Sequence, residues 1–120
     1  MKFNTSMPIY LQVITAIKRD LVTGKMKAGD KLPSGRELAT LYEINPNTAA
    51  RVYSELEQEG ITFTRRGLGT YVTEDEALIR RLKEEMAEEL VTRFLEEMKE
   101  LGIPPEDAIN MATNALSRKL

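Results

Sequence analysis

Two residue types that build many active sites and metal sites are absent, because the 120 residues include neither cysteine nor histidine. Their absence excludes most metal sites with nitrogen or sulfur ligands, cysteine nucleophiles and histidine general bases. The carboxylates fall mostly on the expected outer faces of helices. We therefore identify no catalytic residue, no metal ligand and no cofactor site, and we expect a protein that is not an enzyme.

Long apolar runs are also missing, so the sequence predicts no membrane-spanning segment and no membrane partner. The N-terminal residues lack the apolar core of a signal peptide, and the lack of cysteine agrees with a reducing compartment. We therefore expect a cytoplasmic location. A chain of 120 residues is long enough for one domain, or for a small domain with an appended element.

Charge is distributed unevenly along the chain, although the formal net charge is only -2. Residues 1–73 contain ten Lys or Arg and seven Asp or Glu, a balance of +3, whereas residues 74–120 contain seven and twelve, a balance of -5. Such asymmetry indicates two parts with different roles. A polyanionic partner is expected to bind the first part.

Hydrophobic spacing predicts a first helix over about residues 8–23, with an apolar residue at every fourth position and Gly24 at its end. A second, short helix is predicted to begin after Ser34, which forms a capping box with Glu37. We expect its buried face to consist of Leu38 and Leu41.

A third helix is predicted to begin only a few residues later. Asn45 is a favourable N-cap, Pro46 suits the first helical position, and Gly60 ends the element. Two helices joined by so short a turn are typical of a helix-turn-helix. The alternating residues after Gly60 and the pair Tyr71-Val72 then predict a two-stranded hairpin across residues 66–69, which would be the wing.

The remaining residues predict a long amphipathic helix over 75–101 and a final helix over 105–118, with Gly102 and two prolines between them. The fold expected is thus mainly α with a small β-hairpin: a winged helix-turn-helix in residues 1–73, followed by a helical dimerisation region in residues 74–120. The apolar stripe of the long helix is broader than a coiled-coil seam, which indicates that a second chain covers it. We refer to this set as the tail stripe, and it consists of Leu78, Leu82, Met86, Leu90, Phe94, Met98 and Leu101.

In a winged helix-turn-helix the second helix of the motif enters the major groove of DNA, and the hairpin reaches the adjoining backbone or minor groove. The polar residues at the start of the third helix suit base edges or phosphates, and the arginines and glycines of the hairpin suit close approach to the sugar-phosphate backbone. The candidate DNA-binding residues are Arg36, Asn45, Asn47, Thr48, Arg51, Arg65, Arg66, Gly67 and Gly69.

Each of these features also has an ordinary structural explanation. Capping residues mark many helices, glycines form many tight turns, and paired arginines are common on exposed hairpins. A protein-interaction adaptor that uses the winged helix only as a scaffold is therefore the alternative. The order and spacing of the parts together favour DNA binding.

Over about residues 7–73 the sequence resembles the N-terminal DNA-binding domain of the GntR family of bacterial transcription regulators. The matching segments are PIYLQ, KMKAGDKLPS with the REL that follows, NPNTA, and LEQEGI with RRGLGTYV. The short helical tail resembles the YtrA-like subfamily. This resemblance implies a homodimer that binds a palindromic operator in double-stranded DNA, usually as a repressor and often near genes for an ABC transporter.

Family contacts implied by the resemblance fall on Arg36, Thr48 and Arg51 and on the wing glycines Gly67 and Gly69. The sequence departs from many relatives at Pro46 and Ala50, where they carry arginine. We therefore expect Asn47 and Thr48 to take over base recognition. The sequence names no effector, since the tail is too short for the ligand-binding domains of other subfamilies.

Overall fold

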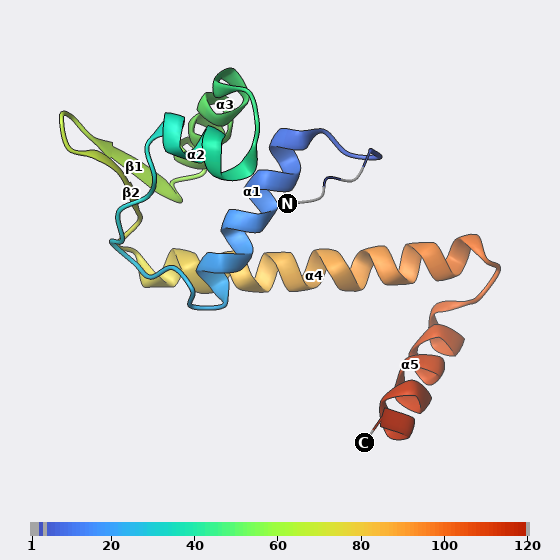
Figure 1. Ribbon diagram of the computed structural model, residues 1–120. Coiled ribbons are helices and arrows are strands. Elements are labelled where there is room, and N and C mark those ends of the chain that lie inside the picture. The colour runs from blue at the N-terminus through green and yellow to red at the C-terminus, as the bar shows by residue number, and fades with distance from the viewer. Residues whose placement is uncertain (1–2, 4, 120) are drawn as a thin grey trace. The chain divides into compact units, whose positions relative to one another are not determined.

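The computed structural model describes residue 3 and residues 5–119, and in this part of the chain it contains five α-helices and one β-hairpin (Figure 1). This confirms the predicted fold class. The elements are α1 (Ile9–Val22), α2 (Gly35–Tyr42), α3 (Pro46–Gln58), β1 (Thr62–Arg65), β2 (Gly69–Val72), α4 (Glu76–Glu100) and α5 (Pro105–Lys119).

The chain forms two compact units, which divide between Leu82 and Lys83. The first turns of α4 therefore belong to the same unit as the helix-turn-helix and the hairpin. The domain boundary predicted between residues 73 and 74 stays a prediction.

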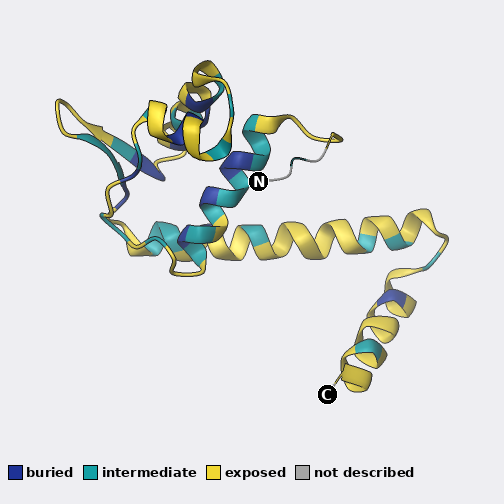
Figure 2. Ribbon diagram, in the orientation of Figure 1, coloured by how far each residue is buried: buried dark blue, intermediate teal, exposed yellow. Residues whose placement is uncertain are grey.

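The core of the first unit lies where α1, α2 and α3 meet the base of the hairpin (Figure 2). Apolar residues recur on one face of each helix, so folding removes these faces from water together. The most deeply buried large side chains are Val13, Leu38, Val52, Leu56, Ile61 and Val72.

The N-terminal ends of α2 and α3 form where the capping residues in the sequence predict them. The Ser34 hydroxyl accepts a hydrogen bond from the Glu37 amide at 3.1 Å, and the Glu37 carboxylate accepts one from the Ser34 amide at 2.9 Å. Asn45 caps α3 by accepting a bond from the Asn47 amide at 2.7 Å. Both caps satisfy backbone donors that a helix start leaves unpaired, and both predictions are confirmed.

The predicted buried face of α2 is wrong at one position. Leu38 is buried, but Leu41 is 65% exposed and Ala39 is buried in its place. Because successive residues turn by about 100° in a helix, a face centred between Leu38 and Ala39 turns Leu41 toward solvent.

The hairpin is antiparallel, and its register pairs Arg65 with Gly69. Gly69 is therefore the first residue of β2, whereas the sequence placed it in the loop. A third segment lies beside β2 and was not predicted from the sequence. Lys31 forms an isolated bridge with Tyr71, and the Leu32 amide donates to the Thr70 carbonyl at 2.8 Å.

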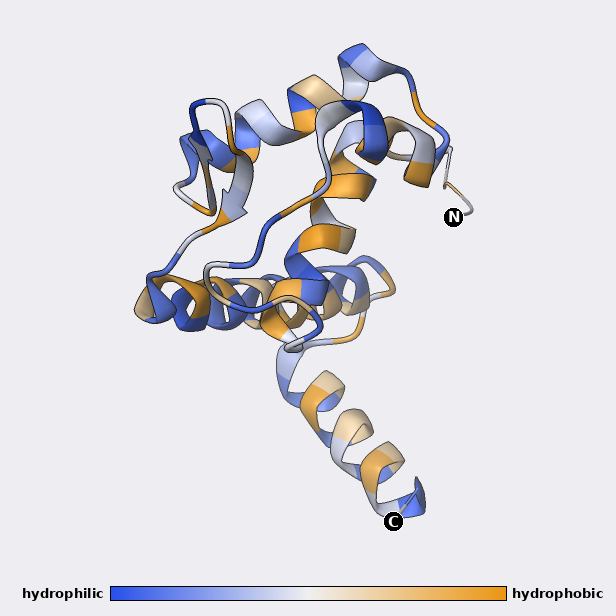
Figure 3. Cartoon of the chain, turned by 60° about the vertical axis from the view of Figure 1, so that its left-hand side comes forward, coloured by the Kyte–Doolittle hydropathy of each residue, from blue (hydrophilic) through white to orange (hydrophobic). Residues whose placement is uncertain are grey.

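The second unit contains the rest of α4 and all of α5. Gly102 ends α4 with a positive φ of 79°, while the Ile103 amide donates to the Met98 carbonyl at 3.0 Å, which is the bond of a Schellman motif. Apolar residues recur along both helices (Figure 3). In the single chain Leu90, Phe94 and Leu101 of the tail stripe are exposed, together with Met111 and Leu116 of α5. Leu82 differs, because it is only 6% exposed within the single chain.

Candidate nucleic-acid interface

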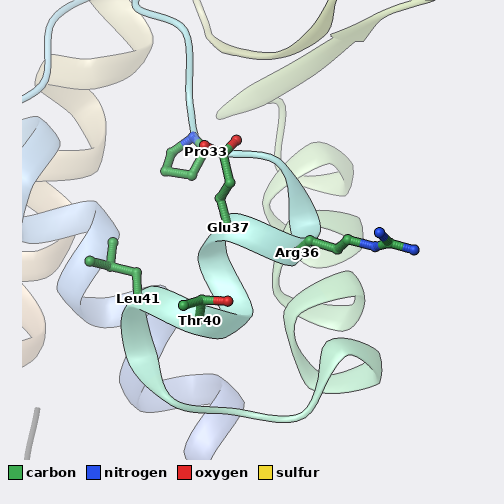
Figure 4. A pocket seen from close by; sticks show the side chains of 5 residues that line it. All are labelled: Pro33, Arg36, Glu37, Thr40 and Leu41. Carbon is green, nitrogen blue, oxygen red and sulfur yellow. The ribbon is translucent and has the colours of Figure 1, made fainter.

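The first cationic position is at the start of α2. Arg36 occupies the first turn of the helix and is exposed, beside the capping box described above. It lines an open depression with Pro33, Glu37, Thr40 and Leu41, and its side chain extends away from the other four (Figure 4). A cation held this way is accessible to a phosphate group.

The hydrogen bonds of the capping box lower the pKa of the Glu37 carboxyl, with a smaller contribution from the charge of Lys31. Glu37 is thus an anion, and one of its carboxylate oxygens already accepts a hydrogen bond from the Ser34 amide. The carboxylate stabilises the helix start that carries Arg36.

The start of α3 presents two short polar side chains beyond its cap. Asn47 is exposed and Thr48 is half-buried, at the second and third helical positions. The side-chain oxygen of Asn45 already accepts the Asn47 amide, so only its amide nitrogen is left to donate to a ligand. Asn45 is consequently a structural cap first, while Asn47 and Thr48 are better placed as contacts.

Arg51 lies one turn further along α3 and has two neighbours. Its guanidinium carbon is 3.7 Å from the centre of the Tyr10 ring of α1, a cation–π contact. Its Nε is 3.4 Å from a carboxylate oxygen of Glu55, one turn later on α3. The side chain nevertheless remains 57% exposed.

The wing arginines differ from each other. Arg65 lies 5.4 Å from the ring centres of both Phe63 and Tyr71, and its guanidinium is 3.7 Å from a carboxylate oxygen of Glu74. Arg66 is exposed in the turn, and no ion pair links it to another described residue. Arg66 is therefore the more available of the two for a polyanion.

Both predicted wing glycines have backbone angles that favour glycine. Gly67 has a φ of +78° and Gly69 a φ of +123°. At Gly69 an added Cβ would also lie 3.0 Å from Cε of Lys31. The glycines allow the tight turn, and the Lys31 side chain runs beside it.

All the predicted DNA-binding residues lie in the first unit, on the start of α2, the start of α3 and the wing. Three neighbours of this surface were not predicted from the sequence, namely Tyr10, Lys31 and Glu55. Only Glu55 carries a local signal, because it follows Arg51 by four residues. The described part of the chain has no group of acidic residues arranged to hold a metal ion, and none of its helices has an apolar stretch able to cross a bilayer.

Residues 9–72 match the family described as bacterial regulatory proteins, gntR family. The chain is 44% identical over 108 residues to the HTH-type transcriptional regulator YhcF of Bacillus subtilis, covering 90% of this chain and 89% of the relative. It is 46% identical over 99 residues to the HTH-type transcriptional repressor YtrA of the same organism, covering 82% and 72%.

Solved structures give the same result over nearly the whole chain. A GntR family transcriptional regulator from Listeria monocytogenes matches with a TM-score of 0.85 and 46% identity, covering 93% of this chain and 98% of the other. A transcriptional regulator from Oenococcus oeni matches with a TM-score of 0.76 and 31% identity, covering 97% of each chain. The similarity therefore includes the helical tail as well as the winged helix.

Proposed function

The chain belongs to the gntR family of bacterial regulatory proteins and is a DNA-binding transcriptional regulator, and on that premise we propose that it represses transcription as a homodimer bound to a palindromic operator. The observation that supports this most directly is the arrangement on the first unit. Exposed polar and cationic side chains occupy the start of α3, the start of α2 and the wing tip. These are the parts of a winged helix that face DNA.

In this proposal the start of α3 enters the major groove, where Asn47, Thr48 and Arg51 meet base edges. Arg36 and Arg66 bind phosphates on either side, and Gly67 and Gly69 let the wing approach the backbone closely. Arg65 supports the wing through its contacts with Phe63 and Tyr71, and it adds positive charge near the DNA. Asn45 mainly holds the helix start in position.

The homodimer is proposed from the exposed apolar residues of α4 and α5. Leu90 of α4 is 53% exposed in the single chain, and Leu101, directly after the end of α4, is 75% exposed. Phe94 and Met98 lie on the same stripe. Leaving so many large apolar side chains in water is unfavourable, and a second copy of the same face would cover them. Two-fold symmetry would then present two copies of α3 to two half-sites of a palindrome.

Repression is proposed from the similarity to YtrA, whose name describes a repressor. A dimer bound over a promoter would block transcription without any enzymatic activity. The resemblance to the YtrA-like subfamily suggests ABC transporter genes as targets, and the positions of operators in the genome of origin would identify them.

Selection from a randomised duplex library at about 150 mM salt tests the proposal. We expect enrichment of a palindrome whose half-sites lie about one helical turn, or a multiple of it, apart. Affinity for the enriched site should fall steeply with salt, with a log-log slope of about -0.9 for each phosphate neutralised. Replacing Arg36 or Arg66 by Ala should make that slope shallower by about one phosphate.

A selection that enriches no sequence, with only weak binding that disappears as salt rises, would contradict the proposal. The same result would favour a protein-interaction adaptor that uses the winged helix as a scaffold. A site without two-fold symmetry would retain the DNA-binding surface but contradict the homodimer on a palindrome.

A further inference from the structure

Arg51 is held from two sides before any DNA is present. The ring of Tyr10 lies against one face of its guanidinium at 3.7 Å, and Glu55 lies beside Nε at 3.4 Å. Tyr10 belongs to α1, while Arg51 and Glu55 both belong to α3. A side chain with many rotamers is therefore restrained by a rigid aromatic ring and by a carboxylate on its own helix.

This arrangement leaves one edge of the guanidinium unused. A guanidinium has five N–H donors, and the terminal nitrogens present a planar fork. Among the described residues no hydrogen bond or ion pair involves these terminal nitrogens of Arg51, and the side chain is 57% exposed. The fork is the edge that binds two acceptors at once, such as O6 and N7 of guanine in the major groove.

Glu55 influences which acceptors the fork can take. A phosphate oxygen carries a charge that the nearby Glu55 carboxylate would repel, whereas the guanine edge is neutral. The side chain of Glu55 is 35% exposed, so the repulsion is reduced by solvent but acts at short range. The neighbouring carboxylate thus favours a base over the backbone.

We propose that Tyr10 and Glu55 are positioning residues for sequence recognition, which hold Arg51 so that its terminal nitrogens bind a guanine edge in each half-site. The proposal rests on the proposed DNA-binding function and refines the role of Arg51 within it, because it names the base edge that Arg51 binds and the two residues that hold its side chain. It also extends the recognition surface to α1, a helix outside the helix-turn-helix.

A double-mutant cycle on the enriched operator tests the role of Tyr10. Tyr10→Leu should weaken specific binding roughly fivefold, because it removes the aromatic face that restrains the cation. Tyr10→Phe keeps that face and should bind like the unchanged protein. In an Arg51→Ala background, Tyr10→Leu should have no further effect. An equal loss in both backgrounds would overturn the proposal, since Tyr10 would then act independently of Arg51.

Glu55→Gln tests the electrostatic part, because it removes the charge and keeps the shape. We expect binding to random DNA to strengthen and its salt slope to steepen by about 0.9, as Arg51 becomes free to pair with a phosphate. The preference for guanine at one position of each half-site should weaken. Glu59→Gln is the matched control, because Glu59, the C-cap of α3, also pairs with a cation, Lys18 at 3.1 Å, and does not contact Arg51 in the described part of the chain. Equal effects of the two variants would mean that Glu55 acts only through the net charge of the protein, and not on Arg51 in particular.

The contact can also be measured without DNA, which separates this proposal from the proposed function. The NMR signal of the Arg51 Nε–H group should be shifted by the Tyr10 ring in the free protein, and the shift should be retained in Tyr10→Phe and lost in Tyr10→Leu. A signal unaffected by either variant would overturn the positioning role even if the protein binds its operator. A shifted signal in a protein that selects no DNA sequence would instead mean that the proposed function has failed.

Discussion

At the scale of single residues, the C-terminal end of α2 contains a strained backbone conformation at a residue that is not glycine. Glu43 has a φ of 55°, and it is the one non-glycine residue with positive φ in the described part of the chain. Its position allows the Ile44 amide to donate to the Ala39 carbonyl at 2.9 Å and so to close the helix. A left-handed conformation costs a non-glycine residue about 1–2 kcal/mol, so the turn of the helix-turn-helix is formed at some loss of stability.

Glu43→Gly should therefore stabilise the protein. We expect a gain of about 0.5–1 kcal/mol in the free energy of unfolding, which is the relief of strain less the entropy that glycine loses on folding. Urea denaturation at one fixed protein concentration measures it. Glu43→Ala is the control, because alanine keeps the strain and removes only the charge. A gain of the same size in both variants would assign the effect to charge and not to backbone conformation.

The capping box of α2 makes one contribution to stability depend on pH. Hydrogen bonds from Ser34 lower the pKa of Glu37 from its ordinary value of 4.5. A lowered pKa in the folded state means that the stabilisation is fully present above that ordinary value and is lost as the pH falls through the folded pKa. We expect wild-type protein to lose stability in this acid range more steeply than Glu37→Gln, which cannot titrate. Parallel curves of unfolding free energy against pH for the two proteins would contradict this.

At the scale of elements, the wing depends on two glycines that are not equivalent. Gly67 has a φ of +78°, close to the left-handed helical region, and an added Cβ would meet nothing within 4 Å. Gly69 has a φ of +123°, which lies outside that region, and its Cβ would meet Lys31 at 3.0 Å. Because the Lys31 side chain can move, the backbone angle is the main obstacle at Gly69.

Alanine substitutions should reveal this difference. Gly67→Ala should destabilise by about 1–2 kcal/mol, whereas Gly69→Ala should cost more because few alanines adopt its backbone angle. Denaturation measures the two values, and operator binding shows whether the wing still closes on DNA. If Gly67→Ala were the more damaging to stability, the assignment of strain within the turn would be wrong.

Local signals in the sequence predicted most elements, and contacts between distant residues accounted for what it missed. Ser34 and Asn45 each act on backbone groups within three residues, so the helix starts could be read directly. Leu41 was misplaced because the neighbour that α2 packs against, and not spacing alone, decides which face is buried. Tyr10 could not be linked to Arg51, since the contact joins two helices far apart in sequence.

At the scale of the whole molecule, the charge asymmetry and the exposed apolar residues suggest that the two parts of the chain have different roles. The basic excess lies in residues 1–73, and the acidic excess lies in the helices that follow. Acidic side chains along α4 would repel DNA, and its apolar residues would bind a second copy. The binding energies of the two half-sites would add together only while the two copies remain associated. Tight operator binding would then require dimerisation.

Leu90→Glu tests that condition at a position chosen for its 53% exposure in the single chain. The fold of one chain should tolerate the change, but each dimer would bury two charged groups in place of two leucines. Losing about 1.5 kcal/mol of apolar burial per chain already predicts a dimer dissociation constant raised roughly a hundredfold. We expect sedimentation to show a monomer at micromolar concentration, with far-ultraviolet circular dichroism unchanged.

The DNA measurement decides whether association matters for recognition. Leu90→Glu should bind the full palindrome little better than an isolated half-site, because the DNA-binding units of its two copies are no longer joined in one dimer. Thr92→Glu is the matched control, since it adds the same charge to an exposed position about 200° around α4 from Leu90, away from the tail stripe. A monomeric Leu90→Glu that kept full affinity for the palindrome would separate dimerisation from operator binding. A dimeric Leu90→Glu would mean that the two copies associate through another surface.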